Sequence, residues 1–203
     1  MENRYYFSIR YLPEHVDNEL LAGRCISTMH GFMSQERNNR FKNSVGISFF
    51  NWTELSVGNE ISFVSTHRDI LTGLSFQPYL STMINEGVFD ISEIREVPSS
   101  GVEAQFVFNK TIQKIFIASK KRRVKRAINR AEAQGKSYIP IPNEEREFDL
   151  FHEIPVCSQS LGNEFILHIQ RRFPEALEAG KVFNSYGFSS NDKWKGTVPI
   201  VSF

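Results

Sequence analysis

The sequence contains little cysteine and no long apolar run. Cys25 and Cys157 are the only cysteines among 203 residues and no CxxC spacing occurs, so we expect neither a disulfide framework nor a cysteine-bound zinc ion. Residues 1–7 lack the charged and apolar segments of a secretory signal, and no stretch approaches the roughly 20 apolar residues that span a bilayer. These absences predict a soluble, cytoplasmic protein without a membrane partner.

Several catalytic motifs are missing as well. The chain has no Gly-rich phosphate loop, no HExxH and no GxSxG, which argues against nucleotide hydrolysis, zinc chemistry and serine hydrolysis of the common kinds. Its five histidines, at positions 15, 30, 67, 152 and 168, show no metal-ligand spacing. We therefore expect no metal site and no cofactor.

A dense basic run occupies residues 120–130, in a chain whose formal net charge is only +1. Val124, Ala127, Ile128 and Ala131 recur at helical spacing, which predicts a helix that docks this apolar stripe on the protein body. The remaining arc of that helix carries Arg122, Arg123, Arg126 and Arg130. Arginine presents a planar fork of donors to phosphate oxygens, so RNA or DNA is the expected partner. The alternative is a solvated helix face, although such faces usually interleave glutamate with the cations.

The first half of the chain alternates between strand and helix patterns. Residues at period two predict strands and residues at helical spacing predict helices, with Asp17 or Asn18 as the cap of the first helix and a turn at Gly58 and Asn59. In order, we expect a strand over 5–12, a helix reaching Phe32, a hairpin of strands over 45–50 and 61–64, an imperfect helix over 68–85 and a strand over 88–97. This βαββαβ order is the ferredoxin-like arrangement, within an α+β protein.

The second half is less regular. Its composition changes after residue 98, so we expect a ferredoxin-like domain over residues 1–98 and a smaller α+β domain over residues 99–203. The second domain is expected to contain a strand over 104–108, the basic helix, an acidic segment over 143–149, strands over 156–160 and 164–169 joined by a turn, and a strand over 182–188.

Four segments offer chemistry suited to RNA. His30 lies near the end of the first helix, beside its apolar face, and an imidazole suits a proton acceptor or donor in RNA cleavage; the alternative is a packed or capping histidine. Ser158 and Ser160 can hold a ribose or phosphate, or bond their own turn. Phe165 and Tyr186 can stack on a base, or belong to the core.

Taken in order, these segments resemble the type I-F CRISPR-associated endoribonucleases that cut precursor CRISPR RNA within its repeats. The resemblance rests on the opening strand, the arginine-rich helix and four short motifs. These motifs are Met29-His30-Gly31-Phe32, Val45-Gly46-Ile47-Ser48-Phe49, Ser158-Gln159-Ser160-x-Gly162-Asn163-x-Phe165 and Phe183-x-x-Tyr186-Gly187-Phe188-Ser189. The segments Tyr5-Tyr6-Phe7, Leu12-Pro13-Glu14 and Leu21-Ala22 also resemble the branch that serves RNA-guided transposons.

The resemblance implies a role for each matching residue. His30 would act on the 2′-hydroxyl beside the scissile phosphate, Ser158 would fix that ribose with Ser160 in support, and Tyr186 would orient the histidine. Phe165 would stack beneath the terminal base pair of the repeat hairpin. The helix that enters the hairpin's major groove would bear Lys121, Arg122, Arg123, Arg126 and Arg130. The products would be a 2′,3′-cyclic phosphate and a 5′-hydroxyl, made without metal.

The chain departs from the family pattern before the basic helix. Phe108 and Lys110 align with the positions of a base-reading arginine and glutamine, which leaves Lys110 and its neighbour Asn109 as candidates for base contacts. The polar loop over 37–43 has no assigned role, although Arg37, Arg40 and Lys42 can reach phosphates.

The resemblance also implies partners. These are the CRISPR repeat hairpin, the other subunits of a type I-F effector complex and, for the transposon branch, a TniQ-type transposition protein. Two other classes of protein remain open from the residues alone: a non-catalytic RNA-hairpin-binding subunit, and a DNA-binding protein that uses the basic helix in a major groove, for which no helix-turn-helix spacing is present.

Overall fold

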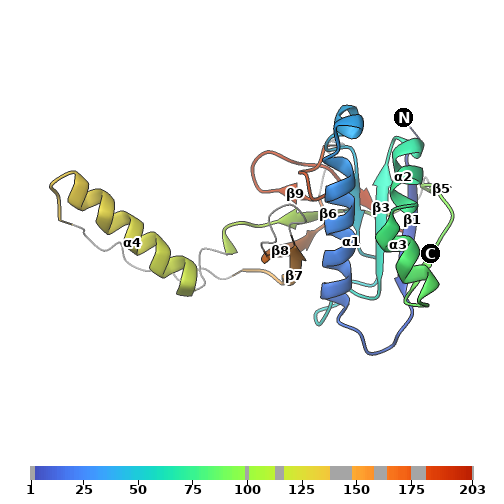
Figure 1. The fold of residues 1–203 in the computed structure, drawn as a ribbon, viewed down its shortest axis with the longest axis horizontal. Coiled ribbons are helices and arrows are strands. Elements are labelled where there is room, and N and C mark those ends of the chain that lie inside the picture. The colour runs from blue at the N-terminus through green and yellow to red at the C-terminus, as the bar shows by residue number, and fades with distance from the viewer. Residues whose placement is uncertain are drawn as a thin grey trace.

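The computed structural model describes residues 3–98, 101–112, 117–137, 148–157, 164–174 and 182–202. Two sheets form the body of the molecule, three helices lie along the first sheet, and a fourth helix extends away from the body (Figure 1). This is the mixed α+β architecture that the sequence predicts.

The first sheet has the ferredoxin-like order β2-β3-β1-β4, and its pairings are antiparallel. Its elements and their connections are β1 (Tyr5–Tyr11), α1 (Asn18–Met33), η1 (Glu36–Phe41), β2 (Gly46–Ser48), β3 (Glu60–Ser65), α2 (Arg68–Ser75), α3 (Pro78–Asn85), β4 (Phe89–Ile91) and β5 (Arg95–Glu96). The predicted hairpin of the two middle strands is confirmed, since β2 and β3 pair in antiparallel register.

Two predicted elements of this half are interrupted. The expected helix over 68–85 is two helices, because Pro78 cannot continue a helix but is well placed at the first turn of α3. The expected strand over 88–97 consists of β4 and the two-residue β5, which pair with opposite ends of β1.

The central strand β1 is buried on both faces. An aromatic side chain packs on one face, and a serine hydroxyl lies on the other. Phe7 packs on Phe63 with ring centroids 5.3 Å apart. On the opposite face, the Ser8 hydroxyl lies 2.6 Å from that of Ser62. Small hydroxyl side chains on this face allow a backbone to approach closely, and Ser62 donates to the carbonyl of Val201 at 3.3 Å. The chain near residue 201 therefore covers the face of the first sheet that the helices leave open.

The second sheet has the order β10-β6-β8-β7, with β9 parallel to β6. Its strands are β6 (Glu103–Phe108), β7 (His152–Cys157), β8 (Glu164–Arg172), β9 (Ser189–Ser190) and β10 (Val198–Pro199). The predicted antiparallel pairing of β7 with β8 is confirmed for the described residues, where Val156 is opposite Phe165. The predicted strand over 182–188 is wrong: these residues form a turn that precedes β9.

One hydrophobic core extends across both sheets. Phe49 of the first half meets Phe106 of β6 edge to face, with centroids 5.3 Å apart. Arg4 and Glu103 form a part-buried ion pair between the same two halves. The predicted domain boundary at residues 98 and 99 stays a prediction, but the packing couples the two halves on either side of it.

Strand β7 lies directly against helix α1. A Cβ at Gly23 of the helix would overlap the carbonyl oxygen of Pro155, so only glycine allows this approach. Further along, the backbone N–H of Cys157 donates to the Ser27 hydroxyl at 3.3 Å. The helix and the strand therefore run in the same direction, side by side.

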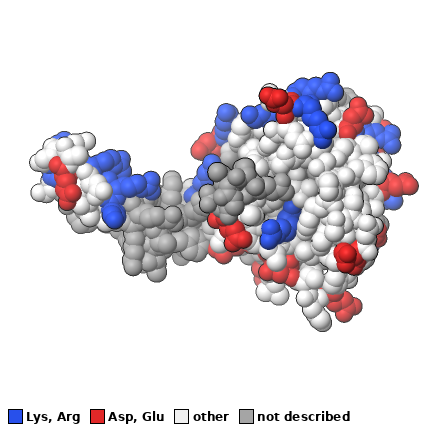
Figure 2. Space-filling model, in the orientation of Figure 1, with Lys and Arg blue, Asp and Glu red and all other residues white. Residues whose placement is uncertain are grey.

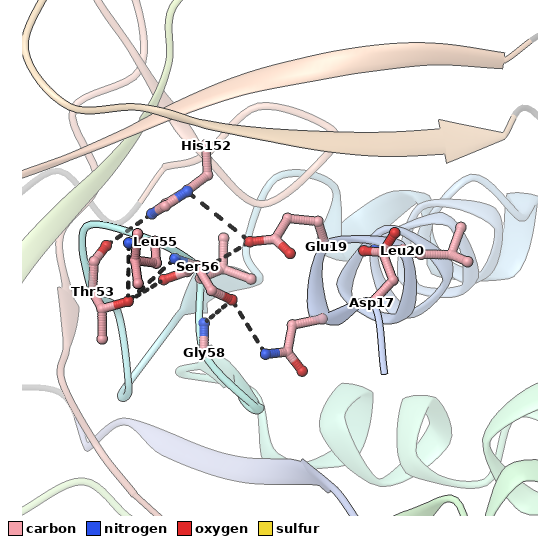
Figure 3. A network of polar contacts seen from close by, with 10 residues as sticks. Asp17, Glu19, Leu20, Thr53, Leu55, Ser56, Gly58 and His152 are labelled. Carbon is pink, nitrogen blue, oxygen red and sulfur yellow. Dashed lines mark hydrogen bonds and ion pairs between the residues drawn. The ribbon is translucent and has the colours of Figure 1, made fainter. Parts of the chain in front are cut away.

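A polar cluster fixes the first residue of β7 against the beginning of α1. Figure 3 shows the His152 ring of β7 between Glu19 of α1 and the loop that contains Thr53. The His152 Nε2 donates to the Thr53 carbonyl at 2.9 Å, and Nδ1 lies 4.0 Å from a Glu19 carboxylate oxygen. The same carboxylate accepts from the Val57 backbone N–H at 3.0 Å. The beginning of β7 is thus tied to both the helix and the β2–β3 connection.

Helix α4 (Ile117–Ala133) confirms the predicted helix over the basic run. It stands away from both sheets (Figure 1), so the expected docking of its apolar stripe on the body is not seen among the described residues. The stripe is short and half alanine, which leaves little apolar area to drive such docking. None of the helices in the described ranges combines the length and apolar composition needed to cross a membrane.

The α1–β7 contact predicts that replacing Gly23 destabilises the fold. Gly23→Ala should lower the free energy of unfolding by about 1–3 kcal/mol, the usual cost of overpacking, because its methyl group meets backbone that cannot move alone. Gly101→Ala is the control and should change stability little, since its methyl group would meet Pro199 and Pro98 only at van der Waals distances of 3.4 and 3.5 Å. Chemical denaturation measures both, and equal stability of the two variants would contradict the prediction.

Candidate active site

His30 lies in the last turn of α1, where its ring is held from one side by a distant part of the chain. Its Nδ1 is 2.8 Å from the backbone carbonyl of Ser185, which is 155 residues away. A carbonyl oxygen only accepts, so Nδ1 must carry the proton and the neutral ring presents its lone pair at Nε2. No residue in the described ranges hydrogen-bonds Nε2. His30 can therefore accept a proton at one defined atom.

Tyr186 fixes the plane of the His30 ring. The two rings stack with centroids 4.3 Å apart and an interplanar angle of 19°. On its other side, Tyr186 meets Phe165 of β8 edge to face at 5.6 Å. Burial raises the pKa of the Tyr186 phenol, because burial disfavours the charged tyrosinate, so the hydroxyl stays protonated at neutral pH. The structure thus brings together three of the residues that the sequence selected.

The turn over 184–188 places both Ser185 and Tyr186. The side-chain oxygen of Asn184 accepts from the backbone N–H groups of Tyr186 and Phe188, at 2.8 and 3.2 Å. Gly187 has φ +80° and leaves no space for a Cβ against Ile47 and Met29. Asn184, Ser185 and Gly187 were missed as site residues, although asparagine, serine and glycine are all common turn residues.

The catalytic candidate Ser158 and the RNA-binding candidate Ser160 lie outside the described residues. The described part of β7 ends at Cys157, whose backbone N–H bonds Ser27. Ser27 precedes His30 by three residues, which is slightly less than one helical turn. The chain therefore leaves the described part of β7 close to the turn of α1 that bears His30.

The residues predicted to contact RNA have different placements. Arg126 and Arg130 are exposed on α4, whereas the side chains of Lys121, Arg122 and Arg123 lie outside the described part. Figure 2 shows lysine and arginine gathered along α4, at a distance from the body.

The two candidates for base contacts differ in exposure. Lys110 is exposed, with its Nζ 5.6 Å from the centroid of the Phe108 ring. Asn109 disagrees with its predicted role, because it is only 4% exposed and its side chain is already bonded: Nδ2 donates to Gln170 at 2.8 Å, and Oδ1 accepts from Asn191 at 3.0 Å.

The fold and the site together are those of a protein that acts on nucleic acid: one oriented imidazole, an aromatic pair beside it and an arginine-bearing helix. The family model described as CRISPR-associated protein (Cas_Csy4) matches residues 6–201, and the chain belongs to this family. Its members are endoribonucleases that process CRISPR repeat RNA. The family resemblance predicted from the sequence is thereby confirmed, while the transposon-associated branch stays a prediction.

A solved structure described as "CRISPR associated protein Cas6" is also similar. The identity is 8%, the alignment covers 97% of this chain and 98% of that chain, and the TM-score is 0.37. No curated protein matches the chain. In the described ranges, no group of three or more His, Cys, Asp or Glu residues is arranged to hold a metal ion.

The stacking geometry predicts which part of Tyr186 matters. Tyr186→Phe keeps the ring on His30 and should retain cleavage within about tenfold, whereas Tyr186→Ala frees the imidazole and should slow cleavage about 100-fold, as misplaced catalytic groups do. Single-turnover cleavage of a repeat hairpin measures both rates. If the two variants were equally slow, the hydroxyl rather than the ring would carry the function.

Proposed function

We propose that the chain is a metal-independent endoribonuclease that binds the CRISPR repeat hairpin and cleaves precursor CRISPR RNA at the 3′ base of that hairpin. The observation that carries the proposal is the held His30 ring, with Nδ1 on the Ser185 carbonyl, one face on Tyr186 and Nε2 directed to no described residue. A packed or capping histidine would not need two independent contacts from a segment 155 residues away.

The proposed reaction uses the RNA's own 2′-hydroxyl as the nucleophile. His30 Nε2 removes the proton from this hydroxyl, and the 2′ oxygen then forms a bond to phosphorus. The bond from phosphorus to the 5′ oxygen breaks, and that oxygen takes up a proton from water, while His30 releases its own proton to water. The products are a 2′,3′-cyclic phosphate and a 5′-hydroxyl. Tyr186 is neutral at pH 7 and adds no negative charge beside the phosphate, and burial raises the pKa of its phenol further.

Positioning of the ribose belongs to the β7–β8 hairpin in this proposal. The reacting groups must lie in line, so a residue that holds the ribose contributes mainly by orientation. Ser158 follows directly after Cys157, where β7 runs beside α1 toward His30, and we assign it to the ribose with Ser160 in support. Phe165, half-buried against Tyr186, supplies the ring on which the last base pair of the hairpin stacks.

Helix α4 supplies affinity rather than chemistry. It carries the exposed Arg126 and Arg130 and extends away from the body (Figure 1), which allows the helix to enter a groove of the RNA. An A-form major groove is too narrow for side chains to read along its length, so entry requires a short stem with an open end. Lys110, exposed where β6 ends, is the remaining candidate for a base contact near the hairpin base.

The contacts between α4 and the hairpin also imply a lasting complex with the product. Contacts to the hairpin are unaffected by cleavage at its base, so the enzyme stays bound to the mature RNA as a subunit of a type I-F effector complex. In a transposon-associated system, a TniQ-type protein would join that complex.

The first test concerns His30. His30→Ala should slow cleavage about 10²- to 10⁴-fold, the usual contribution of a general acid or base, with hairpin affinity unchanged. His15→Ala, in the exposed loop before α1, is the matched control and should cut at the wild-type rate.

The His30 assay is run in EDTA, with an all-ribose hairpin and with one carrying a single 2′-deoxy nucleotide at the cut site. The proposal expects cleavage of the first RNA only. Wild-type protein that shifts the all-ribose hairpin without cutting it would instead identify a non-catalytic binding subunit.

The second test concerns α4. Arg126→Gln with Arg130→Gln should weaken hairpin binding and reduce the slope of log affinity against log salt by about 1 for each phosphate that the helix no longer binds. Arg95→Gln removes an exposed charge from β5 and should leave the slope unchanged. A double variant with the wild-type slope would show that α4 does not face the RNA.

A further inference from the structure

Three side-chain amides meet where the stretch of chain that carries α4 joins the body. This α4 stretch begins after Asn109, at the end of β6, and ends before Asp149, shortly before β7. Asn109 and Gln170 of β8 are 4% and 2% exposed, and Asn191, which follows β9, is half-buried. Burial of an amide is unfavourable unless the amide is hydrogen-bonded, so these groups depend on the partners that the fold brings to them.

Gln170 bonds both ends of the α4 stretch at once. Its Oε1 accepts from Nδ2 of Asn109 at 2.8 Å, and its Nε2 donates to the backbone carbonyl of Asp149 at 3.0 Å. The Arg172 guanidinium also donates to that Oε1, at 3.3 Å. A carbonyl oxygen only accepts, so the Asp149 bond fixes which way round the Gln170 amide lies. One side chain of β8 therefore holds the residue before the stretch and the residue after it close together.

Asn109 also directs the chain as it leaves the sheet. Its backbone N–H donates to the His168 carbonyl of β8 at 2.9 Å, which continues the ladder between β6 and β8. Its side-chain Oδ1 accepts from the backbone N–H of Thr111 at 3.0 Å, an Asx turn that bends the chain out of the strand. Lys110 lies between these two bonds and is exposed. The turn therefore leaves the remaining candidate for a base contact free of the sheet.

The same Asn109 oxygen connects this point to the segment that supports His30. Asn191 Nδ2 donates to it at 3.0 Å. Asn191 comes directly after β9, which runs parallel to β6, and β9 follows the turn over 184–188. That turn supplies the carbonyl and the aromatic ring that contact the His30 imidazole. The three amides thus join the ends of the α4 stretch to the support of the candidate catalytic histidine.

Amides are suited to holding a geometry. Apolar contacts are non-directional, whereas a hydrogen bond requires its donor and acceptor to be aligned. Helix α4 extends away from both sheets (Figure 1), so its position depends on how the two ends of its stretch are held.

We propose that Asn109, Gln170 and Asn191 are positioning residues, which fix the two ends of the α4 stretch and thereby set where RNA held by the helix meets His30. The inference rests on the proposed function, to which it adds the part of the body that places the RNA-binding helix. The three amides act through the helix, so they affect the rate at which bound RNA is cut rather than the phosphate contacts of α4.

The first test measures the position of α4 without RNA. Spin labels are attached through Arg24→Cys in α1 and Asn129→Cys in α4, both exposed positions, in a chain that carries Cys157→Ser. Cys25 is buried and stays unlabelled. Double electron–electron resonance then reports the distribution of distances between the two labels.

Gln170→Met should broaden or displace this distribution, because methionine has a similar shape but bonds neither Asn109 nor Asp149. Gln77→Met is the matched control and should leave the distribution unchanged. It removes the bond from another side-chain amide to a backbone carbonyl, that of Gly73 at 2.8 Å, between α2 and α3.

The second test separates positioning from binding. At protein concentrations that saturate the hairpin, Gln170→Met should cut about 10- to 100-fold more slowly, as misplaced reacting groups do, with the salt slope of hairpin binding unchanged. Gln77→Met should cut at the wild-type rate. Circular dichroism confirms that each variant is folded at the assay temperature. Gln170→Glu keeps an acceptor for Asn109 but not the amide donor to Asp149, and it serves where the methionine variant does not fold, with Gln77→Glu as its control.

The inference is overturned if the label distances in the Gln170 variant match those of the parent chain, or if they change while the saturated cleavage rate does not. It is also overturned if the Gln77 control changes as much, or if the Gln170 variant has a lower salt slope, since lost phosphate contacts would then explain slower cleavage. A parent chain that fails to cut an all-ribose hairpin would overturn the proposed reaction instead. The label distances, measured without RNA, would still show whether the amides position α4.

Discussion

The close approach of α1 and β7 at Gly23 is the constraint on which the rest of the molecule depends. A helix of the first sheet and a strand of the second pass within backbone contact there, so neither can shift without the other. Because the two elements run in the same direction, the end of β7 arrives beside the last turn of α1. The placement of β7 beside the helix that bears His30 is therefore a consequence of packing, and His152 anchors the beginning of that strand.

The candidate site needs few residues because its one histidine is well supported. Ser185 contributes only a carbonyl and Tyr186 mainly a ring face, yet together they determine the tautomer and the plane of His30. Neither contact brings a charged group to the ring. Helix α4, with its exposed arginines, extends well away from α1 (Figure 1). The basic helix and the oriented histidine are thus separate parts of the structure.

The sequence predicted the helices and strands better than the turns and the contacts between distant residues. The ferredoxin-like half followed from period-two and helical patterns, and His30, Phe165 and Tyr186 were selected through short motifs. The strand predicted over 182–188 failed because its alternating apolar residues match a strand pattern, while Asn184 and Gly187 impose a turn. The placement of Asn109 could not be predicted either, since its burial depends on Gln170 and Asn191, which approach it only in the folded sheet.

The late position of the turn over 184–188 in the chain also matters during synthesis on the ribosome. A ribosome makes His30 and then the arginine helix long before it reaches Tyr186, and the contact that orients the imidazole spans 155 residues. A nascent chain can thus display its arginine-bearing helix while the His30 ring still lacks both the carbonyl and the aromatic ring that hold it. Synthesis of this turn completes the surroundings of His30.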